Sequence, residues 1–238
     1  MKILFIHGLF ETAMTYEEVC KSLELAGHNT YNWHATGLDN SCYVDGSPTK
    51  AYVDEIARLL LVVDFDAVIA SGYGATLLLK AMNKVNTKAE ILLFNPVYSG
   101  IFKLKILSPL IACIPAIQKF LRWLPGRIQT PIIKLLQMPI TNDRRYHDTI
   151  EQAVLRSNPK VLMRSLSECV WMSLNLRQKK KITLFVSTED RIMSKRDYYN
   201  LYKDFNFNDK YTISLPHNTV LTNLSWFKRT VEIFIENI

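Results

Sequence analysis

A glycine-rich turn between a predicted strand and a predicted helix is the stretch of this sequence that most strongly suggests chemistry. Ala67 to Ala70 is an apolar, strand-like run, and Ala75 to Met82 has helical character. The residues that join them, Ala70-Ser71-Gly72-Tyr73-Gly74-Ala75, fall on the G-x-S-x-G pattern of a nucleophile elbow. Such a turn places one side chain above the end of a parallel strand, and small neighbours allow close backbone contacts.

Gly72 occupies the place of the nucleophile in this turn. Covalent acyl transfer needs an oxygen or sulfur whose proton a histidine can accept, and glycine offers neither. Ser71 stands one residue early, where a sharp turn would point its hydroxyl elsewhere, and with Ser71 at the apex Tyr73 would replace the second glycine. The sequence therefore favours an elbow without its nucleophile over an elbow that uses Ser71.

Strand-like and helix-like stretches alternate along the rest of the chain. Strands separated by helices predict an α/β fold with a mostly parallel, doubly covered sheet, which binds ligands at the carboxyl ends of its strands. The other predicted strands are Lys2 to His7, His28 to His34, Ala89 to Phe94, Lys181 to Ser187 and Lys210 to Leu215. The predicted helices of this part are Thr15 to Ala26, Ala51 to Val63, Asp197 to Phe205 and Leu224 to Asn237.

The pattern changes at Val97, where strand-like alternation stops and leucine-, isoleucine- and proline-rich helical pieces begin. We expect a helical cap at 97–175, inserted into a core made of 1–96 and 176–238. Between Ser99 and His147 there are eight Lys or Arg residues and one acid, Asp143. The simpler interpretation is a packed cap with a solvated basic rim. The sharper one is an acyl-chain tunnel that attracts a carboxylate, a phosphopantetheine arm or a lipid headgroup.

Composition fits one α/β domain with an insertion. The chain has 238 residues, 48% of them hydrophobic, and a moderate net charge of +7. The four cysteines show no CxxC spacing, which favours reduced thiols and a cytoplasmic protein. The longest uncharged apolar stretch, Ile106 to Gln118, contains two prolines and is shorter than the roughly 20 residues that cross a bilayer.

Five segments, in order, resemble the α/β-hydrolase superfamily, particularly its cap-bearing esterase, thioesterase and lyase members. The resemblance covers essentially the whole chain outside the expected cap. The segments are Ile6-His7-Gly8-Leu9-Phe10, similar to the oxyanion-loop HG motif; Thr36 to Ser41, similar to a degraded P-G-x-G-x-S loop; Ala70 to Ala75, the elbow; Thr188 to Met193, similar to G-x-x-D-x-[IV]-[VM]; and Pro216-His217, similar to the late G-H motif.

The resemblance implies the catalytic roles. Asp190 would be the acid and His217 the base, and the backbone N–H groups of Leu9 and Tyr73 would form the oxyanion hole. Gly72 would be the nucleophile position without a side chain. Backbone donors do not depend on the missing serine, so this part of the machinery would persist.

The substrate implied is a hydrophobic acyl, ester, thioester or polyketide-like molecule, with carrier- or CoA-linked forms included. Phe10, Ser71 and His147 are the expected substrate contacts, whereas His7 is expected to hold the oxyanion loop. No metal cluster, phosphate loop or dinucleotide motif is visible, so no cofactor is expected. The basic residues lack the aromatic interleaving of a nucleic-acid platform, while contact with a membrane surface, without spanning, stays open.

Three functions are compatible with Gly72. The protein can be an enzyme that works without a nucleophile, in which a His217–Asp190 general base supports proton abstraction, cyclisation or condensation, elimination, or direct attack by water. It can be a serine esterase or thioesterase in an inactivated form, with Ser changed to Gly at 72. It can also be a catalytically dead pseudo-hydrolase that binds a ligand or partner. The first is favoured.

Overall fold

The computed structural model describes most of the chain outside its middle part. The described residues are 1–9, 11–40, 42, 44–98, 155–170, 182–190, 192–204, 207–217 and 219–238. They include the whole predicted core apart from single residues and short gaps. Most of the predicted cap, including the expected substrate contact His147, lies outside them, as does Phe10.

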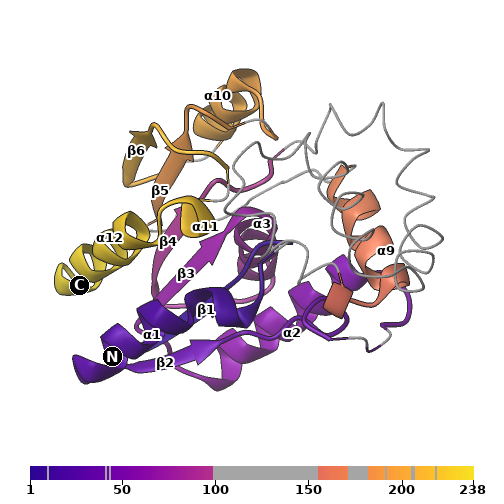
Figure 1. Cartoon of the computed structure of the whole chain (residues 1–238), viewed down its shortest axis with the longest axis horizontal. Coiled ribbons are helices and arrows are strands. Elements are labelled where there is room, and N and C mark those ends of the chain that lie inside the picture. The colour runs from indigo at the N-terminus through magenta and orange to yellow at the C-terminus, as the bar shows by residue number, and fades with distance from the viewer. Residues whose placement is uncertain are drawn as a thin grey trace, which may run out of the picture.

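A six-stranded sheet forms the centre of the described structure (Figure 1), and every strand pair in it is parallel. Its order is β2-β1-β3-β4-β5-β6. The α/β fold class predicted from the sequence is confirmed. The strands are β1 (Lys2–Ile6), β2 (Asn29–Asn32), β3 (Ala67–Ser71), β4 (Glu90–Phe94), β5 (Ile182–Ser187) and β6 (Asp209–Ile213).

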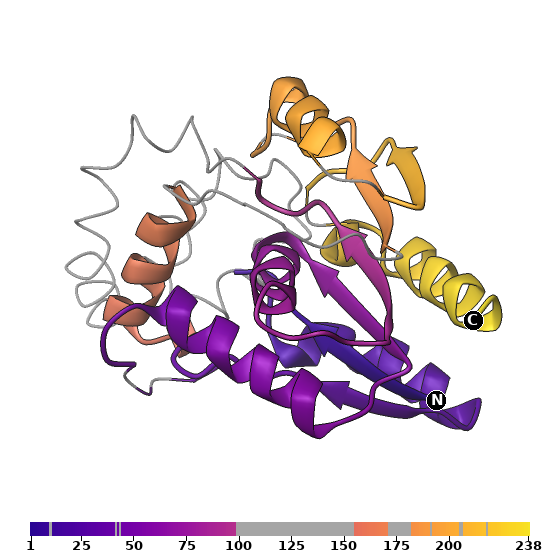
Figure 2. The same ribbon diagram turned by 180° about the vertical axis from the view of Figure 1, so that it is seen from behind.

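Helices cover both faces of the sheet. Helices α1 and α12 lie on the face seen in Figure 1, and α2 and α3 lie on the opposite face, seen in Figure 2. The described helices are α1 (Glu17–Leu25), α2 (Pro48–Val62), α3 (Gly72–Met82), α9 (Pro159–Val170), α10 (Lys195–Asp204), the short α11 (Thr219–Thr222) and α12 (Leu224–Glu236), with a 3-10 turn, η1 (Ala13–Tyr16), before α1.

Alternating side chains of the strands build two separate cores. Leu4 and Ile6 of β1 pack into the core under α2 and α3, whereas Ile3 and Phe5 pack into the core under α1 and α12. All four are at most 1% exposed. Burying one such side chain stabilises the fold by about 1.5–3 kcal/mol. A continuously apolar strand such as β1 therefore stabilises the helix layers on both faces of the sheet.

Several helices begin earlier than their sequence pattern predicts. Helix α2 starts at Pro48 rather than Ala51, because the Ser47 hydroxyl accepts a hydrogen bond from the Lys50 N–H at 3.1 Å and proline suits the first helical position. Helix α3 starts at Gly72 rather than Ala75, since the glycine-rich turn is itself the first turn of the helix.

Helix α9, within the predicted cap range, packs onto the core. Its residues Val161 and Leu162 belong to the core under α2 and α3, and the Thr49 N–H at the start of α2 donates to Glu168 of α9 at 2.9 Å. The boundaries predicted for the cap fall in ranges of which only this part is described, so they stay a prediction.

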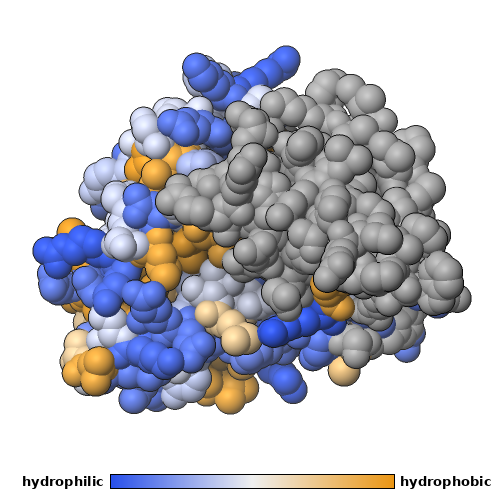
Figure 3. Space-filling model, in the orientation of Figure 1, coloured by the Kyte–Doolittle hydropathy of each residue, from blue (hydrophilic) through white to orange (hydrophobic). Residues whose placement is uncertain are grey.

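The described surface on the α1 and α12 side is mostly hydrophilic, with apolar side chains gathered in separate spots (Figure 3). Exposed large apolar side chains such as Leu25 and Leu61 lie on different helices, α1 and α2. Within the described ranges, no helix has the length and apolarity needed to cross a membrane.

Candidate active site

The candidate site lies at the point where the strand order of the sheet reverses. Strand β2 lies on one side of β1, whereas β3, β4, β5 and β6 follow one another on its other side, so β1 and β3 flank the switch point. Ile6, the last residue of β1, pairs with Ala70 near the end of β3. The loops that follow β1 and β3 therefore emerge side by side, and open α/β sheets bind ligands in the crevice at this place.

Gly72 has the backbone conformation of an elbow apex. Its φ is +49°, whereas Ser71 before it is extended, with φ −123° and ψ 150°. Residues with a side chain rarely adopt a positive φ. A nucleophile elbow tolerates a positive φ at its apex because the sharp turn exposes the nucleophile side chain there. The turn thus keeps the positive φ of a nucleophile elbow, which glycine adopts without strain, although glycine has no side chain to present.

The space beside Gly72 faces His217. A Cβ atom built on Gly72 would lie 3.4 Å from His217 Nε2 and 3.9 Å from Gly8 Cα, both ordinary contact distances. The structure therefore places the imidazole where it would meet a serine side chain.

Gly74 explains why the turn needs its second glycine. A Cβ on Gly74 would lie 2.3 Å from the His7 carbonyl oxygen and 2.7 Å from that of Ile6, which no backbone rearrangement within the turn would relieve cheaply. Helix α3 approaches the end of β1 this closely only because residue 74 has no side chain.

His217 and Asp190 form a buried pair. His217 Nδ1 lies 2.6 Å from Asp190 Oδ2. An ionised carboxylate only accepts hydrogen bonds, so Nδ1 carries the proton and donates it, and in the neutral ring Nε2 turns its lone pair toward the space at Gly72. The sequence prediction that these two residues meet beside the elbow agrees with the geometry.

Three further donors hold Asp190 after β5. Its Oδ1 accepts the N–H groups of Ile192 at 2.7 Å and Met193 at 2.9 Å, and Tyr198 of α10 donates its hydroxyl to Oδ2. Burial acts to raise the pKa of Asp190, but the charge of His217 and these hydrogen bonds outweigh it and lower that pKa. Tyr198 is a site residue that the sequence analysis missed.

Burial also acts to lower the pKa of His217, and two carboxylates outweigh it. Asp190 raises that pKa by its charge and its hydrogen bond, and the charge of Glu11 adds to the effect. The net direction is upward. The imidazolium form is therefore favoured relative to a free histidine.

Asn95 fixes the backbone of His217. It is fully buried at the end of β4, and its φ of 47° is the one positive φ among the described non-glycine residues. Its Nδ2 donates to the His217 carbonyl at 2.6 Å and to Thr219 Oγ1 at 3.1 Å, while its Oδ1 accepts the Ser187 N–H at 2.7 Å. Nothing in the sequence pattern indicates this role of Asn95, which follows a predicted strand.

The expected oxyanion donors belong to the elbow and to the loop after β1. Tyr73 is the second residue of α3, and the first N–H groups of a helix have no acceptor within it. Leu9 follows Gly8, whose loop contacts position 72. His7, expected to hold this loop, is buried; its Nε2 lies 3.1 Å from Asp39 Oδ2 and its ring stacks on Trp33.

Ser71 has its partners on the other face of the sheet. Its hydroxyl donates to Glu11 and lies 2.9 Å from the hydroxyl of Tyr16, a member of the core under α1 and α12. These contacts agree with the expectation that Ser71 is not the nucleophile. The substrate contact expected of Ser71 stays a prediction, as do those of Phe10 and His147.

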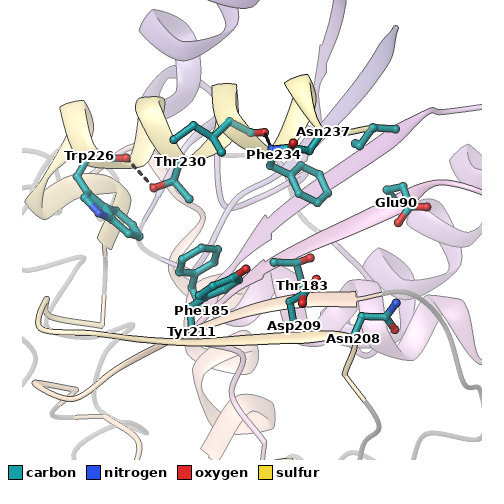
Figure 4. Close-up of a pocket in the computed structure, with 12 residues that line it drawn as sticks. Glu90, Thr183, Phe185, Asn208, Asp209, Tyr211, Trp226, Thr230, Phe234 and Asn237 are labelled. Carbon is teal, nitrogen blue, oxygen red and sulfur yellow. Dashed lines mark hydrogen bonds between the residues drawn. The ribbon is translucent and has the colours of Figure 1, made fainter.

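A cavity of about 700 Å³ lies elsewhere, between α12 and the strands β5 and β6 (Figure 4). Trp226 and Phe234 of α12 face Phe185 and Tyr211 across it. Its other lining residues include those at the amino ends of β4, β5 and β6, whereas Gly72 follows the carboxyl end of β3. This cavity is therefore not part of the candidate site. Among the described residues, no three His, Cys, Asp or Glu side chains are grouped to hold a metal.

This sheet order, the elbow at the switch point and the His–Asp pair after β5 and β6 define the α/β-hydrolase fold. Comparison with solved structures shows the same fold over nearly the whole chain. A protein from Desulfitobacterium hafniense assigned to the α/β-hydrolase family superposes with a TM-score of 0.72 at 13% identity, covering 98% of this chain and 95% of its own.

Two further solved structures show how widely this fold is used. A hydrolase from Oleispira antarctica has a TM-score of 0.73 at 14% identity, covering 100% of this chain and 91% of its own. MenH from S. aureus has a TM-score of 0.66 at 12% identity, and the alignment covers 100% of this chain and 94% of MenH. The sequence matches no protein-family model and no curated protein.

Proposed function

We propose that this protein is an α/β-hydrolase-fold enzyme that acts on a hydrophobic acyl, ester, thioester or polyketide-like substrate without a serine nucleophile. His217 and Asp190 are its general base, and the N–H groups of Leu9 and Tyr73 are its oxyanion donors. The observation that carries the proposal is the placement of His217 Nε2 at 3.4 Å from the Cβ position of Gly72, with Nδ1 on Asp190.

The missing hydroxymethyl group leaves room for the reacting group itself. In hydrolysis, a water molecule in this space would lose a proton to His217 Nε2 while its oxygen attacks the acyl carbon. The imidazolium would then return that proton to the leaving group. In an elimination or cyclisation, Nε2 would instead take a proton from carbon beside the carbonyl. General-base catalysis of this kind contributes about 10²- to 10⁴-fold.

The neighbours support the fold rather than the reaction. The solved structures that share this fold include a hydrolase from Oleispira antarctica and an esterase from Exiguobacterium antarcticum. Acyl and ester chemistry is thus the first class to test on this chain.

The second candidate is a serine esterase or thioesterase in which glycine replaces the nucleophile. The specific observation in its favour is the positive φ of Gly72, together with the contact distance from its Cβ position to His217. Both are what a serine at this position would require.

Three variants separate the candidates on a panel of acyl esters and thioesters. If the enzyme needs no nucleophile, His217→Ala and Asp190→Asn each remove most of the wild-type turnover, by about 10²- to 10⁴-fold, and Gly72→Ser lowers it or leaves it unchanged. If the protein is an inactivated serine enzyme, wild type is inert and Gly72→Ser turns over simple esters with a burst.

A binding protein gives a third pattern. Wild type and Gly72→Ser would then both be inactive, and His217→Ala would leave ligand affinity intact. Turnover by wild type that His217→Ala does not reduce would contradict the proposed general base. Lys21→Ala serves as a control because this exposed side chain forms an ion pair with Glu17 on the surface of α1.

A further inference from the structure

A buried carboxylate that the proposed reaction does not use lies behind the oxyanion loop. Glu11 is 3% exposed and follows β1 by five residues. Its Oε2 accepts the Gly8 N–H at 2.7 Å and the Tyr16 hydroxyl at 2.9 Å, and the Ser71 hydroxyl also donates to it. A single carboxylate thus ties the loop after β1 to the residue before the elbow apex.

These donors suit an ionised Glu11 but do not neutralise it. One is a backbone N–H and two are hydroxyls, and an ionised carboxylate is an acceptor only. Burial and the charge of Glu11 raise the pKa of Tyr16 well above its usual range, so its hydroxyl stays a neutral donor. Removing a carboxylate from water is costly unless hydrogen bonds and opposite charge compensate. Neutral hydrogen-bond donors supply part of this compensation at Glu11, and a nearby positive charge would add to it.

A short path of contacts leads from Glu11 to His217. A Cβ on Gly8 would lie 3.1 Å from Glu11 Cδ, so the carboxylate lies directly against that glycine. Gly8 Cα lies 3.9 Å from the Cβ position of Gly72, which is itself 3.4 Å from His217 Nε2. This path runs through the backbone of the oxyanion loop and the space at Gly72.

Two carboxylates from different strands act on the His217 ring. Asp190, after β5, binds Nδ1, and Glu11, after β1, acts through space, and both raise the pKa of His217. Among the described residues, the other groups that hydrogen-bond to these two carboxylates, from Tyr16, Ser71, Tyr198 and the backbone, are neutral donors.

We propose that Glu11 is a positioning residue that holds the Gly8–Leu9 loop and, together with Asp190, supports a positive charge on His217 in the resting site. The imidazolium then makes up a larger fraction of the resting sites than it would for a free histidine at the same pH. Catalysis as a general base requires the deprotonated fraction, so the rate rises with pH. The effect on rate rests on the proposed function, whereas the charge on His217 can be measured without any substrate.

The direct test is a pH titration of His217 by NMR on the full chain carrying ¹⁵N-labelled histidine, with the resonance assigned by its absence from His217→Ala. In wild type we expect His217 to titrate above the ordinary histidine value of 6.5. In Glu11→Gln its midpoint should fall toward that value, because one of the two charges is gone. A wild-type His217 that titrates at or below 6.5 would overturn the proposal, whether or not any variant folds.

Two matched variants separate charge from packing. Tyr16→Phe removes a donor to Glu11 but keeps the carboxylate, so the His217 midpoint should hardly move. Glu232→Gln removes a carboxylate on α12 that accepts a hydrogen bond from the Ser22 hydroxyl at 3.0 Å, and it should leave the His217 midpoint unchanged. If Tyr16→Phe or Glu232→Gln lowers the midpoint as much as Glu11→Gln does, the assigned role of Glu11 is wrong.

Activity gives the second readout. In Glu11→Gln the acidic limb of the pH–rate profile should move to lower pH together with the NMR midpoint. An acidic limb that stays in place while the NMR midpoint moves would overturn the general-base role of His217 and leave the electrostatic role of Glu11 standing.

Discussion

At the scale of single residues, two features define the site: Gly72 has no side chain, and the groups that would surround a serine side chain at this position are present. A serine there would have to adopt a φ near +49°, a conformation that costs L-residues of the order of 1–2 kcal/mol. Glycine removes that cost, yet His217, Asp190 and the oxyanion loop keep their places around the space. This persistence favours an enzyme that still uses the histidine.

Asn95 should matter to activity although it does not face position 72. In Asn95→Asp the donor to the His217 carbonyl becomes a carboxylate oxygen that repels it, while the acceptor for the Ser187 N–H remains. We expect a loss of about 1–3 kcal/mol in the free energy of unfolding. We also expect turnover to fall by about 100-fold, because the imidazole shifts from its position.

Denaturant unfolding and kcat on the best ester found would measure both effects. Asn40→Asp is the control, since Asn40 uses its side-chain oxygen to accept the Gly37 and Cys42 N–H groups and Asp keeps that acceptor. Equal losses in Asn40→Asp and Asn95→Asp would show that the Asn95 contacts have no special role.

Two of the residues that the sequence did not reveal share one property. Asn95 and Glu11 act through partners that are brought to them by other strands: Asn95 reaches His217 across 122 positions and Glu11 reaches Ser71 across 60. Periodicity reports which face of an element is buried and says nothing about such partners. By contrast, Asp190 and His217 each follow a predicted strand, and strand ends in a parallel sheet converge on one edge.

At the scale of elements, the sequence pattern predicts strands both where burial is two-sided, as in β3, and at the exposed edge strand β6. All six predicted strands are present, with ends that differ by a few residues. The helix expected over Thr15 to Ala26 is shorter, because its start is the 3-10 turn η1. Most of the helical cap expected at 97–175 lies outside the described residues.

The contact between α3 and β1 sets the position of the elbow, and Gly74 is where it can be tested. Gly74→Ala would place a methyl group 2.3 Å from the His7 carbonyl oxygen. We expect the free energy of unfolding to fall by about 1–3 kcal/mol or more, as for overpacked cores, and the elbow to move away from the oxyanion loop.

Chemical denaturation checks this prediction, with Gly46→Ala as the comparison. Gly46 has a positive φ of +71° but nothing within 4 Å of its Cβ position, so its variant reports backbone strain alone. A Gly74→Ala protein as stable as Gly46→Ala would contradict the close approach of α3 to β1.

At the scale of the whole molecule, the His217–Asp190 pair joins the β5 and β6 ends and should make stability depend on pH. His217 has a raised pKa in the folded state, so its contribution is complete below the unfolded value of 6.5 and is lost as pH rises through the folded pKa. Asp190 has a lowered pKa, so its contribution is present above 3.8 and is lost as pH falls through the folded pKa.

Both contributions overlap between about pH 4 and pH 6.5. The difference in free energy of unfolding between wild type and His217→Gln should therefore be largest in this window and shrink above it. Urea titrations at a series of pH values measure this difference, in which the similar contribution of His7 cancels. A difference that grows from pH 6 to pH 9 would show that His217 is not charged in the folded protein.

The most direct test of the central claim is the reactivity of a serine placed at position 72 toward a fluorophosphonate, followed by intact-protein mass spectrometry and peptide mapping. If His217 faces this position as the structure has it, Gly72→Ser becomes labelled at residue 72, wild type does not, and the double variant Gly72→Ser, His217→Ala reacts far more slowly. A folded Gly72→Ser protein that stays unlabelled, or that reacts equally fast without His217, would contradict the account.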